Sequence, residues 1–275
     1  MRPEVQTQLG PFLQSVSQAS KSALLLDYDG TLAPFHIKRD QAFPYLGVSS
    51  VLQEIVRAGH TEVVIISGRD AHEIPPLLNI EPPPEIWGIH GLHRLRSNGT
   101  LEARNLDERT RTGLGDAERW LTYQELRHVA EFKAGTIAVH WRGLEEIVVQ
   151  DICARVLLGW RPIAEHSGLD LLPFDGGVEI RPSMVDKGDA VRTFLNEMGP
   201  EVPAAYLGDD NTDESAFAAI KGRGISILAR PHWRPTDAQF WLKPPGELLD
   251  FLKLWRDLSR TDPTRHPQLL RQQRA

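Results

Sequence analysis

The sequence of 275 residues predicts an α/β protein with a parallel-sheet core that an α+β insertion interrupts. Two observations lead to this class. Short apolar strand signals alternate with helix signals up to residue 90 and again from residue 186, whereas the stretch between them is rich in hairpin signals. Strands that alternate with helices are typical of parallel sheets with right-handed crossovers, so we expect a Rossmann-like core.

The first part of the chain carries a β-α-β-α-β order. Strand signals lie at residues 23–26, 62–67 and 86–90, and helix signals lie at residues 49–58 and 70–78. Pro75 and Pro76 are expected to disturb the second helix, because proline lacks the backbone N–H that a helix interior needs. This order predicts three neighbouring parallel strands.

The middle of the chain changes character. Helix signals lie at residues 107–124 and 145–160, residues 132–141 alternate like one antiparallel strand, and residues 169–173 and 177–182 flank a Phe-Asp-Gly turn. After residue 186, helices at 187–198 and 212–220 alternate with strands at 204–207 and 224–228. We therefore expect a core of residues 1–104 and 183–258, an inserted α+β domain of residues 105–182, and a disordered tail at residues 259–275, with a basic docking tail as the alternative for that last segment.

The composition is that of an ordinary soluble globular protein, with 41% hydrophobic and 25% charged residues. A net charge of −6 argues against a general affinity for nucleic acid. Cys153 is the single cysteine, which excludes an internal disulfide and a cysteine-based metal site. Residues 1–20 lack an apolar signal-peptide core and no segment approaches a membrane span, so we expect a cytoplasmic protein with no membrane partner.

Residues 24–32, Leu-Leu-Leu-Asp-Tyr-Asp-Gly-Thr-Leu, are the most informative feature. Asp27 and Asp29 follow a buried strand at a spacing that sends both carboxylates to one face. Ligands of open parallel sheets bind beyond the carboxyl ends of the strands. Two acids at that place can hold a divalent cation and leave one oxygen free to attack. An Asp-rich turn without a chemical role is the alternative.

Three further positions carry polar groups that the topology places near Asp27. Ser67 ends the second strand just before a helix, which suits an anion, although a simple N-cap is the alternative. Lys187 opens a helix, where the macrodipole disfavours a cation unless an anion lies beside it; a solvated lysine is the alternative. Residues 208–214, Gly-Asp-Asp-Asn-Thr-Asp-Glu, place several acidic side chains close together, and a bound cation would reduce their mutual repulsion. A solvated acidic loop is the alternative. Together these features predict a phosphate site.

In this order the four features resemble the motifs of the haloacid dehalogenase superfamily of phosphohydrolases. The insertion lies between the second and third motifs, as in members with a C2-type cap domain. The finer resemblance is to trehalose-6-phosphate phosphatases. It rests on residues 27–34, 66–69, 88–91 and 208–214 of the core and on residues 131–133, 140–142 and 178–182 of the insertion. The chain departs from the family pattern at Pro75-Pro76, at His93, where the family usually has glutamate, and at Lys38 and Arg39, where a proline-rich segment is expected.

The resemblance implies a Mg²⁺-dependent phosphatase that hydrolyses trehalose 6-phosphate through an aspartyl-phosphate. It implies that Asp27 is the nucleophile, that Asp29 is the general acid and base, and that Ser67 and Lys187 hold the phosphate oxygens. It also implies that Mg²⁺ binds Asp27, the backbone carbonyl of Asp29, and Asp209.

The same resemblance implies roles for residues around this centre. Asp210 and Asp213 would aim Lys187 and the waters of the metal. The residues that would reach sugar hydroxyls from the cap are Glu131, Lys133, Arg142 and Glu179. Arg69 would either assist at the phosphate or brace its loop.

Several alternatives stay open. Another phosphorylated glycoside, such as sucrose phosphate or a glycosyl-glycerate phosphate, would use the same chemistry, and a non-catalytic sugar-phosphate sensor is a third hypothesis. We expect a monomer whose partner is a small sugar phosphate, and the resemblance is compatible with a functional link to a trehalose-6-phosphate synthase. His90 and His140 are expected to be satisfied structural histidines, and Trp141 and Trp160 to be cap core.

Overall fold

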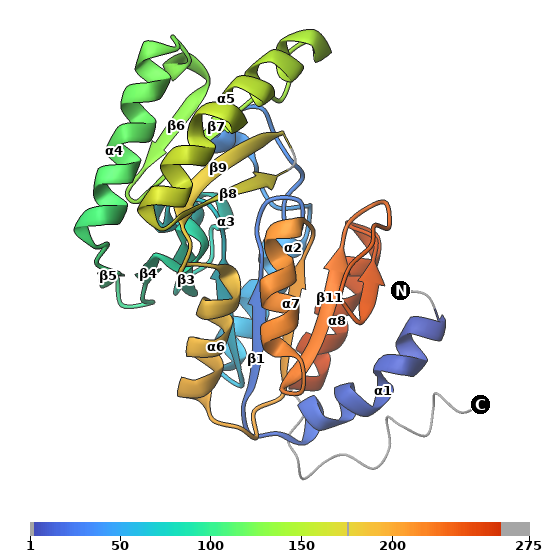
Figure 1. Cartoon of the computed structure of the whole chain (residues 1–275). Helices are drawn as coiled ribbons and strands as arrows, with labels where there is room; N and C mark the ends of the chain where they lie inside the picture. The colour runs from blue at the N-terminus through green and yellow to red at the C-terminus, as the bar shows by residue number, and fades with distance from the viewer. Residues whose placement is uncertain (1–2, 175, 260–275) are drawn as a thin grey trace.

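The computed structural model describes residues 3–174 and 176–259, which form two sheets with helices packed on them (Figure 1). The larger sheet has the strand order β12-β11-β10-β1-β2-β3-β4-β5. The smaller sheet has, in spatial order, β6 (Ala130–Lys133), β7 (Thr136–His140), β9 (Gly177–Pro182) and β8 (Leu169–Phe174). The parallel strands of the larger sheet are β1 (Ser22–Leu26), β2 (Thr61–Ile66), β3 (Glu85–Gly88), β10 (Ala204–Gly208), β11 (Gly224–Ala229) and β12 (Phe240–Leu242). β4 (His93–Leu95) and β5 (Leu101–Ala103) add an antiparallel edge.

Helices cover both faces of the larger sheet. The alternating side chains of β1 explain why: Leu24 and Leu26 point into one apolar cluster, whereas Ala23 and Leu25 point into another. The first face is covered by α1 (Pro3–Gln18), α2 (Val48–Ala58), α3 (Ile74–Leu78) and α8 (Gly246–Ser259), and the second by α6 (Lys187–Met198) and α7 (Glu214–Ile220). This is a doubly wound core, as the alternation of strands and helices predicts.

The inserted α+β unit, called the cap below, consists of α4 (Glu108–Tyr123), β6 (Ala130–Lys133), β7 (Thr136–His140), α5 (Glu146–Ser167), β8 (Leu169–Phe174) and β9 (Gly177–Pro182). Its two helices pack on its antiparallel sheet around the fully buried Trp160, and Trp141 packs against the same cluster. Both tryptophans therefore belong to the cap core, as expected. Figure 1 shows the cap stacked at one end of the larger sheet.

Two predicted strands are wrong in detail. Residues 132–141 form not one strand but the hairpin β6–β7, because Gly135 turns the chain at a φ of 108°. The strand predicted over residues 86–90 ends at Gly88, since Ile89 and His90 adopt φ values of 49° and 56°. This left-handed pair bends the chain under the cap.

The ends of several helices also differ from the sequence expectations. Pro75 and Pro76 lie in the first turn of α3, where their missing N–H groups cost no helix hydrogen bond. A 3-10 turn over Ala71–Glu73 precedes them, with Asp70 as its cap. The helix predicted over residues 145–160 continues to Ser167, where Gly168 ends it in a left-handed conformation.

The chain ends contain one unpredicted element. α1 packs on α8, with the rings of Phe12 and Trp255 centred 6.0 Å apart. Ser259, which we expected to begin the disordered tail, is the last residue of α8 and is buried. The rest of that tail, residues 260–275, lies outside the described residues. Among the helices of residues 3–174 and 176–259, none has the length and apolar character needed to cross a membrane.

Candidate active site

A cavity of about 470 Å³ lies between the carboxyl ends of the central strands and the cap. The parallel register sets its floor: Leu26 of β1 pairs with Leu207 of β10, so Asp27 and Asp209 follow neighbouring strand ends, and their carboxylate oxygens lie within 4.8 Å of each other. Ten of the residues that the sequence singled out line this cavity: Asp27, Asp29, Ser67, Arg69, Lys133, Arg142, Glu179, Lys187, Asp209 and Asp210. The larger sheet and the cap thus contribute to one site.

Asp27, Lys187 and Asp213 form a buried triad at the floor of the cavity. The Lys187 ammonium donates to Asp27 Oδ1 and to Asp213 Oδ1, both at 2.7 Å. Lys187 is 2% exposed, so the solvated-lysine alternative is wrong. Burial alone would lower the pKa of Lys187, but the carboxylates of Asp213 and Asp27 raise it above its ordinary value. The lysine therefore stays charged beside the acids.

Asp27 combines burial with an oriented carboxylate. Burial raises the pKa of Asp27 to about 7, against the opposing effect of Lys187. Its second oxygen, Oδ2, accepts a hydrogen bond of 3.1 Å from the Thr31 hydroxyl. Two donors from opposite sides thus hold a side chain that is 3% exposed. Such a carboxylate is positioned to act as a nucleophile toward a group in the cavity.

Asp27, Asp209 and Asp213 offer oxygen atoms that all lie within 4.8 Å of one another. Burial, followed by the like charges of Asp27 and Asp213, raises the pKa of Asp209 well above its ordinary value. Gly30, at a φ of 87°, permits this crowding, since a Cβ there would lie 2.1 Å from Asp209 Oδ2. Buried carboxylates that repel one another fit a divalent cation with oxygen ligands.

Asp213 differs from the other two acids in its hydrogen bonds. Oδ1 accepts from Lys187 and from the Tyr206 hydroxyl, and Oδ2 accepts the backbone N–H groups of Asp209 and Asp210 at 3.0 Å each. Its oxygens are therefore already occupied by four donors. This arrangement suits a residue that supports the loop from below better than a direct cation ligand.

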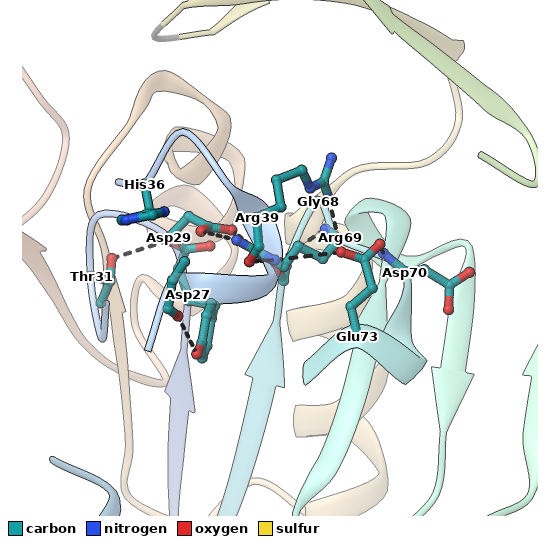
Figure 2. Close-up of polar contacts among 12 residues, drawn as sticks. Asp27, Asp29, Thr31, His36, Arg39, Gly68, Arg69, Asp70 and Glu73 are labelled. Carbon is teal, nitrogen blue, oxygen red and sulfur yellow. Dashed lines mark hydrogen bonds and ion pairs between the residues drawn. The ribbon is translucent and has the colours of Figure 1, made fainter. Parts of the chain in front are cut away.

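Arg69 binds both carboxylate oxygens of Asp29 (Figure 2). Its Nε lies 2.6 Å from Asp29 Oδ2 and its Nη2 lies 2.7 Å from Oδ1, while Nη1 donates to the Arg39 carbonyl at 2.8 Å. Glu73 accepts from both guanidinium groups, at 3.4 Å from Arg69 and 3.3 Å from Arg39. Arg69 is 3% exposed. Of the two roles implied for Arg69, the geometry matches the bracing one.

Ser67 lies at the turn after β2. Its hydroxyl accepts the backbone N–H of Arg69 at 3.2 Å, and its carbonyl accepts the N–H of His90 at 2.9 Å. The Ser67 side chain is buried but lines the cavity. It can therefore donate its hydroxyl proton to an anion bound between Asp27 and Lys187.

Glu179 connects the cap to the core. Lys133 Nζ lies 3.1 Å from Glu179 Oε1 and 2.8 Å from the Gly68 carbonyl, and His90 Nε2 lies 2.7 Å from Glu179 Oε2. Thr136 donates to the same carboxylate at 2.7 Å. Burial would raise the pKa of Glu179, but Lys133 and His90 hold it well below its ordinary value. A buried, ionised carboxylate therefore sits at the junction of cap and core.

Glu131 and Arg142 of the cap both meet the core segment that contains Phe35 and Arg39. Glu131 accepts from His140 Nε2 at 2.8 Å and forms an ion pair with Arg39 of the core. It lines a neighbouring cavity of about 830 Å³ rather than the first. The Arg142 guanidinium stacks on the ring of Phe35 at 4.4 Å. The core loop that contains the departures Lys38 and Arg39 thus touches the cap.

Sequence reasoning missed several members of this site. His90 and His140 bond to cap carboxylates, as expected of satisfied histidines, but both also line the first cavity, which was not expected. The Gly-Ile-His-Gly run was a usable signal for His90, since a bend beside a glycine at a strand end marks functional loops. Arg230 and Arg234, which contact the acidic loop, carried no local signal.

A nucleophile-type aspartate, a second acid two residues on, a buried lysine and an acidic loop beneath a cap define the class of haloacid dehalogenase-type phosphatases. The trehalose-phosphatase family model matches residues 25–243, so the chain belongs to the trehalose-phosphatase family. The resemblance inferred from the motifs and the predicted fold class are thereby confirmed.

Among the relatives, a probable trehalose-phosphate phosphatase 3 of Oryza sativa subsp. japonica is 30% identical over 281 residues, which cover 88% of this chain and 72% of that protein. The trehalose-phosphate phosphatase of Mycobacterium marinum is 30% identical, covering 84% of this chain. This chain spans 60% of the M. marinum protein and 18% of an uncharacterized glycosyl hydrolase of Mycobacterium tuberculosis.

Solved structures agree with the fold. The C-terminal domain of Candida albicans trehalose-6-phosphate phosphatase superposes with a TM-score of 0.77 at 19% identity, over 90% of this chain and 96% of that one. A trehalose-6-phosphate phosphatase related protein superposes with a TM-score of 0.68 at 25% identity, over 86% of this chain and 98% of that one.

Proposed function

We propose that this protein hydrolyses trehalose 6-phosphate to trehalose and phosphate, through an aspartyl-phosphate on Asp27. The observation that carries the proposal is the Asp27 carboxylate held between Lys187 and Thr31 at the floor of a cavity with a polar cap as its roof. The family relationship supports the same activity. Phosphate-monoester hydrolysis needs an acceleration of up to ~10²¹, which requires several groups to act together.

In the proposed reaction an Asp27 oxygen attacks phosphorus and the bond to the sugar oxygen breaks. Lys187 and Ser67 bind the phosphate oxygens. Asp29 gives a proton to the leaving sugar oxygen. Asp29 then takes a proton from the water that attacks phosphorus, the bond from phosphorus to the Asp27 oxygen breaks, and phosphate leaves, so Asp27 and the proton of Asp29 are both restored. Arg69 occupies both oxygens of Asp29 here, so one of them must turn from the guanidinium to reach the sugar oxygen.

Mg²⁺ is the proposed cofactor, held by Asp27, Asp209 and the backbone carbonyl of Asp29. The crowding of Asp27 and Asp209 supports the two carboxylate ligands, the Asp29 carbonyl follows from the family resemblance, and Asp213 and Asp210 would support the loop around them. When bound, the cation would neutralise charge on the phosphate and orient it. The remaining positive charge at the floor comes from Lys187.

We propose that residues 105–182 form the sugar-recognition domain. Lys133, Arg142 and Glu179 line the roof of the cavity, and Glu131 lines the adjoining cavity. Their charged groups match the donors and acceptors of sugar hydroxyls. Binding energy from the sugar would position the phosphate over Asp27.

The test is a phosphate-release panel with Mg²⁺ and with chelator. It compares trehalose 6-phosphate with sucrose phosphate, a glycosyl-glycerate phosphate, glucose 6-phosphate and p-nitrophenyl phosphate. The proposal expects the highest kcat/KM for trehalose 6-phosphate and loss of activity in chelator. A higher kcat/KM for another phosphorylated glycoside would identify that compound as the substrate instead. Binding of a sugar phosphate without turnover of any substrate would indicate a sensor.

A further inference from the structure

The loop that carries Asp209 is held from behind by two arginines. Arg234 Nε donates to the Asp209 carbonyl at 3.2 Å and its Nη2 donates to the Asp210 carbonyl at 2.6 Å. Arg230 Nη1 donates to the Asp209 carbonyl at 3.2 Å. Both arginines come from the segment between β11 and β12, which no motif of the site includes.

This segment is itself anchored. The backbone N–H of Arg230 donates to the Leu242 carbonyl at 3.1 Å, and the Arg230 carbonyl accepts from the Trp241 indole at 2.9 Å. Glu214 of α7 lies 2.5 Å from Arg234 Nη1 and accepts from the Thr236 hydroxyl at 2.8 Å. The Arg234 side chain is 14% exposed. The guanidinium therefore has little freedom to leave the loop.

The backbone of Asp209 and Asp210 is thus held through its N–H groups and through its carbonyl groups. Asp213 accepts the N–H groups of Asp209 and Asp210, while Arg234 binds their carbonyl groups. The Asp209 side chain is buried and faces the like charges of Asp27 and Asp213. Backbone restraint is what can keep this carboxylate turned into the crowded site.

We propose that Arg234, assisted by Arg230, is a positioning residue of the divalent-cation site, which holds the Asp209 carboxylate ready for the metal. This inference rests on the metal ligands proposed above. It assigns a role to a segment outside the phosphatase motifs.

Two effects of Arg234 oppose each other. A positive charge behind the site repels a cation, whereas the hydrogen bonds to the loop hold its ligand in place. Glu214 lies against the same guanidinium and offsets its charge, so the repulsion is reduced. Groups that orient metal ligands are commonly worth about 10- to 100-fold in metal affinity. Positioning is therefore the larger effect.

The test measures the Mg²⁺ affinity of the whole chain from the rise of Tm during a Mg²⁺ titration, without any substrate. Arg234→Ala is expected to raise the Mg²⁺ Kd by about 10- to 100-fold. Arg234→Lys keeps the charge but cannot bond two carbonyls in one plane, so its Kd should also rise. If the alanine variant does not fold, the lysine variant still tests the proposal.

Arg223→Ala is the matched control. Arg223 also bonds two backbone carbonyls, those of Leu195 and Gly199 at 2.9 Å each, but from the opposite end of β11. The Arg223→Ala variant should lower the metal-free Tm and leave the Mg²⁺ Kd unchanged.

An unchanged or lower Kd in both Arg234 variants would overturn the positioning role and leave the metal site standing. A wild-type Tm that does not change with Mg²⁺ concentration would overturn the metal site and this inference together, whatever the phosphatase panel shows. An equal rise of Kd in Arg223→Ala would show that general destabilisation explains the effect, and would also overturn the inference.

Discussion

Arg69 holds both carboxylate oxygens of Asp29, with Nε 2.6 Å from Oδ2 and Nη2 2.7 Å from Oδ1. Glu73 and the Arg39 carbonyl hold the remaining part of the same guanidinium (Figure 2). The proposed acid and base is therefore oriented by a side chain from the end of the neighbouring strand.

Arg69→Lys should impair proton transfer, because an ammonium cannot bond both Asp29 oxygens in the plane of the carboxylate. We expect kcat for a sugar phosphate to fall by about 10²-fold, the lower end of what acid catalysis supplies. The first step with p-nitrophenyl phosphate, whose leaving group needs no proton, should be spared, so a burst of p-nitrophenolate should precede slow hydrolysis of the aspartyl-phosphate. Rapid-mixing kinetics measure the burst, and Asp29→Asn should show the same pattern. Loss of the burst would place Arg69 at the phosphate instead.

Asp27→Asn should abolish turnover by removing the attacking oxygen. The fold should survive, because burial already raises the pKa of Asp27 to about 7 and a neutral amide is tolerated there. We expect kcat to fall by at least about 10³-fold while the metal-free Tm changes by only a few degrees. Phosphate release and thermal unfolding measure the two effects. Activity within about tenfold of wild type would refute Asp27 as the nucleophile.

Arg142→Ala should weaken sugar recognition from the cap. Its guanidinium stacks on Phe35 and lines the cavity, so its loss should raise KM for trehalose 6-phosphate by about tenfold and spare p-nitrophenyl phosphate. Arg155→Ala, which removes an arginine bonded to Gln124 elsewhere in the cap, is the control and should leave both substrates unaffected. Parallel losses on both substrates would indicate a structural role for Arg142.

Glu179→Gln should cost stability that depends on pH. The pKa of Glu179 is lower in the folded protein than in the unfolded chain, so its contribution is present above pH 4.5 and is lost as the pH falls through the folded pKa. Removing one partner of this buried cluster should cost about 3 kcal/mol at pH 7. Urea unfolding at several pH values should show the wild-type and variant curves converging below pH 4.5. Curves that stay parallel into acid would contradict this. Glu102→Gln, at an exposed ion pair, should show little difference.

His90 should make the protein less stable in mild acid. Burial lowers its pKa despite the attraction of Glu179, so the unfolded chain binds the proton first as the pH falls below 6.5. The geometry agrees, since a neutral ring with its proton on Nε2 can donate to Glu179 while Nδ1 has no hydrogen-bond partner.

The variant His90→Asn suits this test, because asparagine tolerates the left-handed φ of 56°. The free energy of unfolding, measured between pH 7 and pH 5, should change less steeply with pH in His90→Asn than in wild type. An unaltered slope in His90→Asn would show that His90 does not titrate on unfolding.

The sequence by itself determined the class of the fold and most residues of the candidate site. Asp27 and Asp29 were found because a buried strand has a side-chain period of two and ends where ligands bind. Lys187 stood out because a cation at a helix start needs a nearby anion. Such signals act over a few residues, so they survive without knowledge of the fold. The hairpin at Gly135 and the bend at His90 were not predicted, since each depends on a positive φ that the pattern of apolar residues does not reveal.

Only the tertiary structure decided which groups meet. Lys187 bonds Asp27 across 160 positions of sequence, Arg39 pairs with Glu131 of the cap, and Arg234 reaches the carbonyls of the acidic loop. None of these pairs has a local signature, because a hydrogen bond depends on distance and direction in space. Strand order and register set those distances. The chemistry could therefore be predicted from residue types, whereas the partners that tune it required the fold.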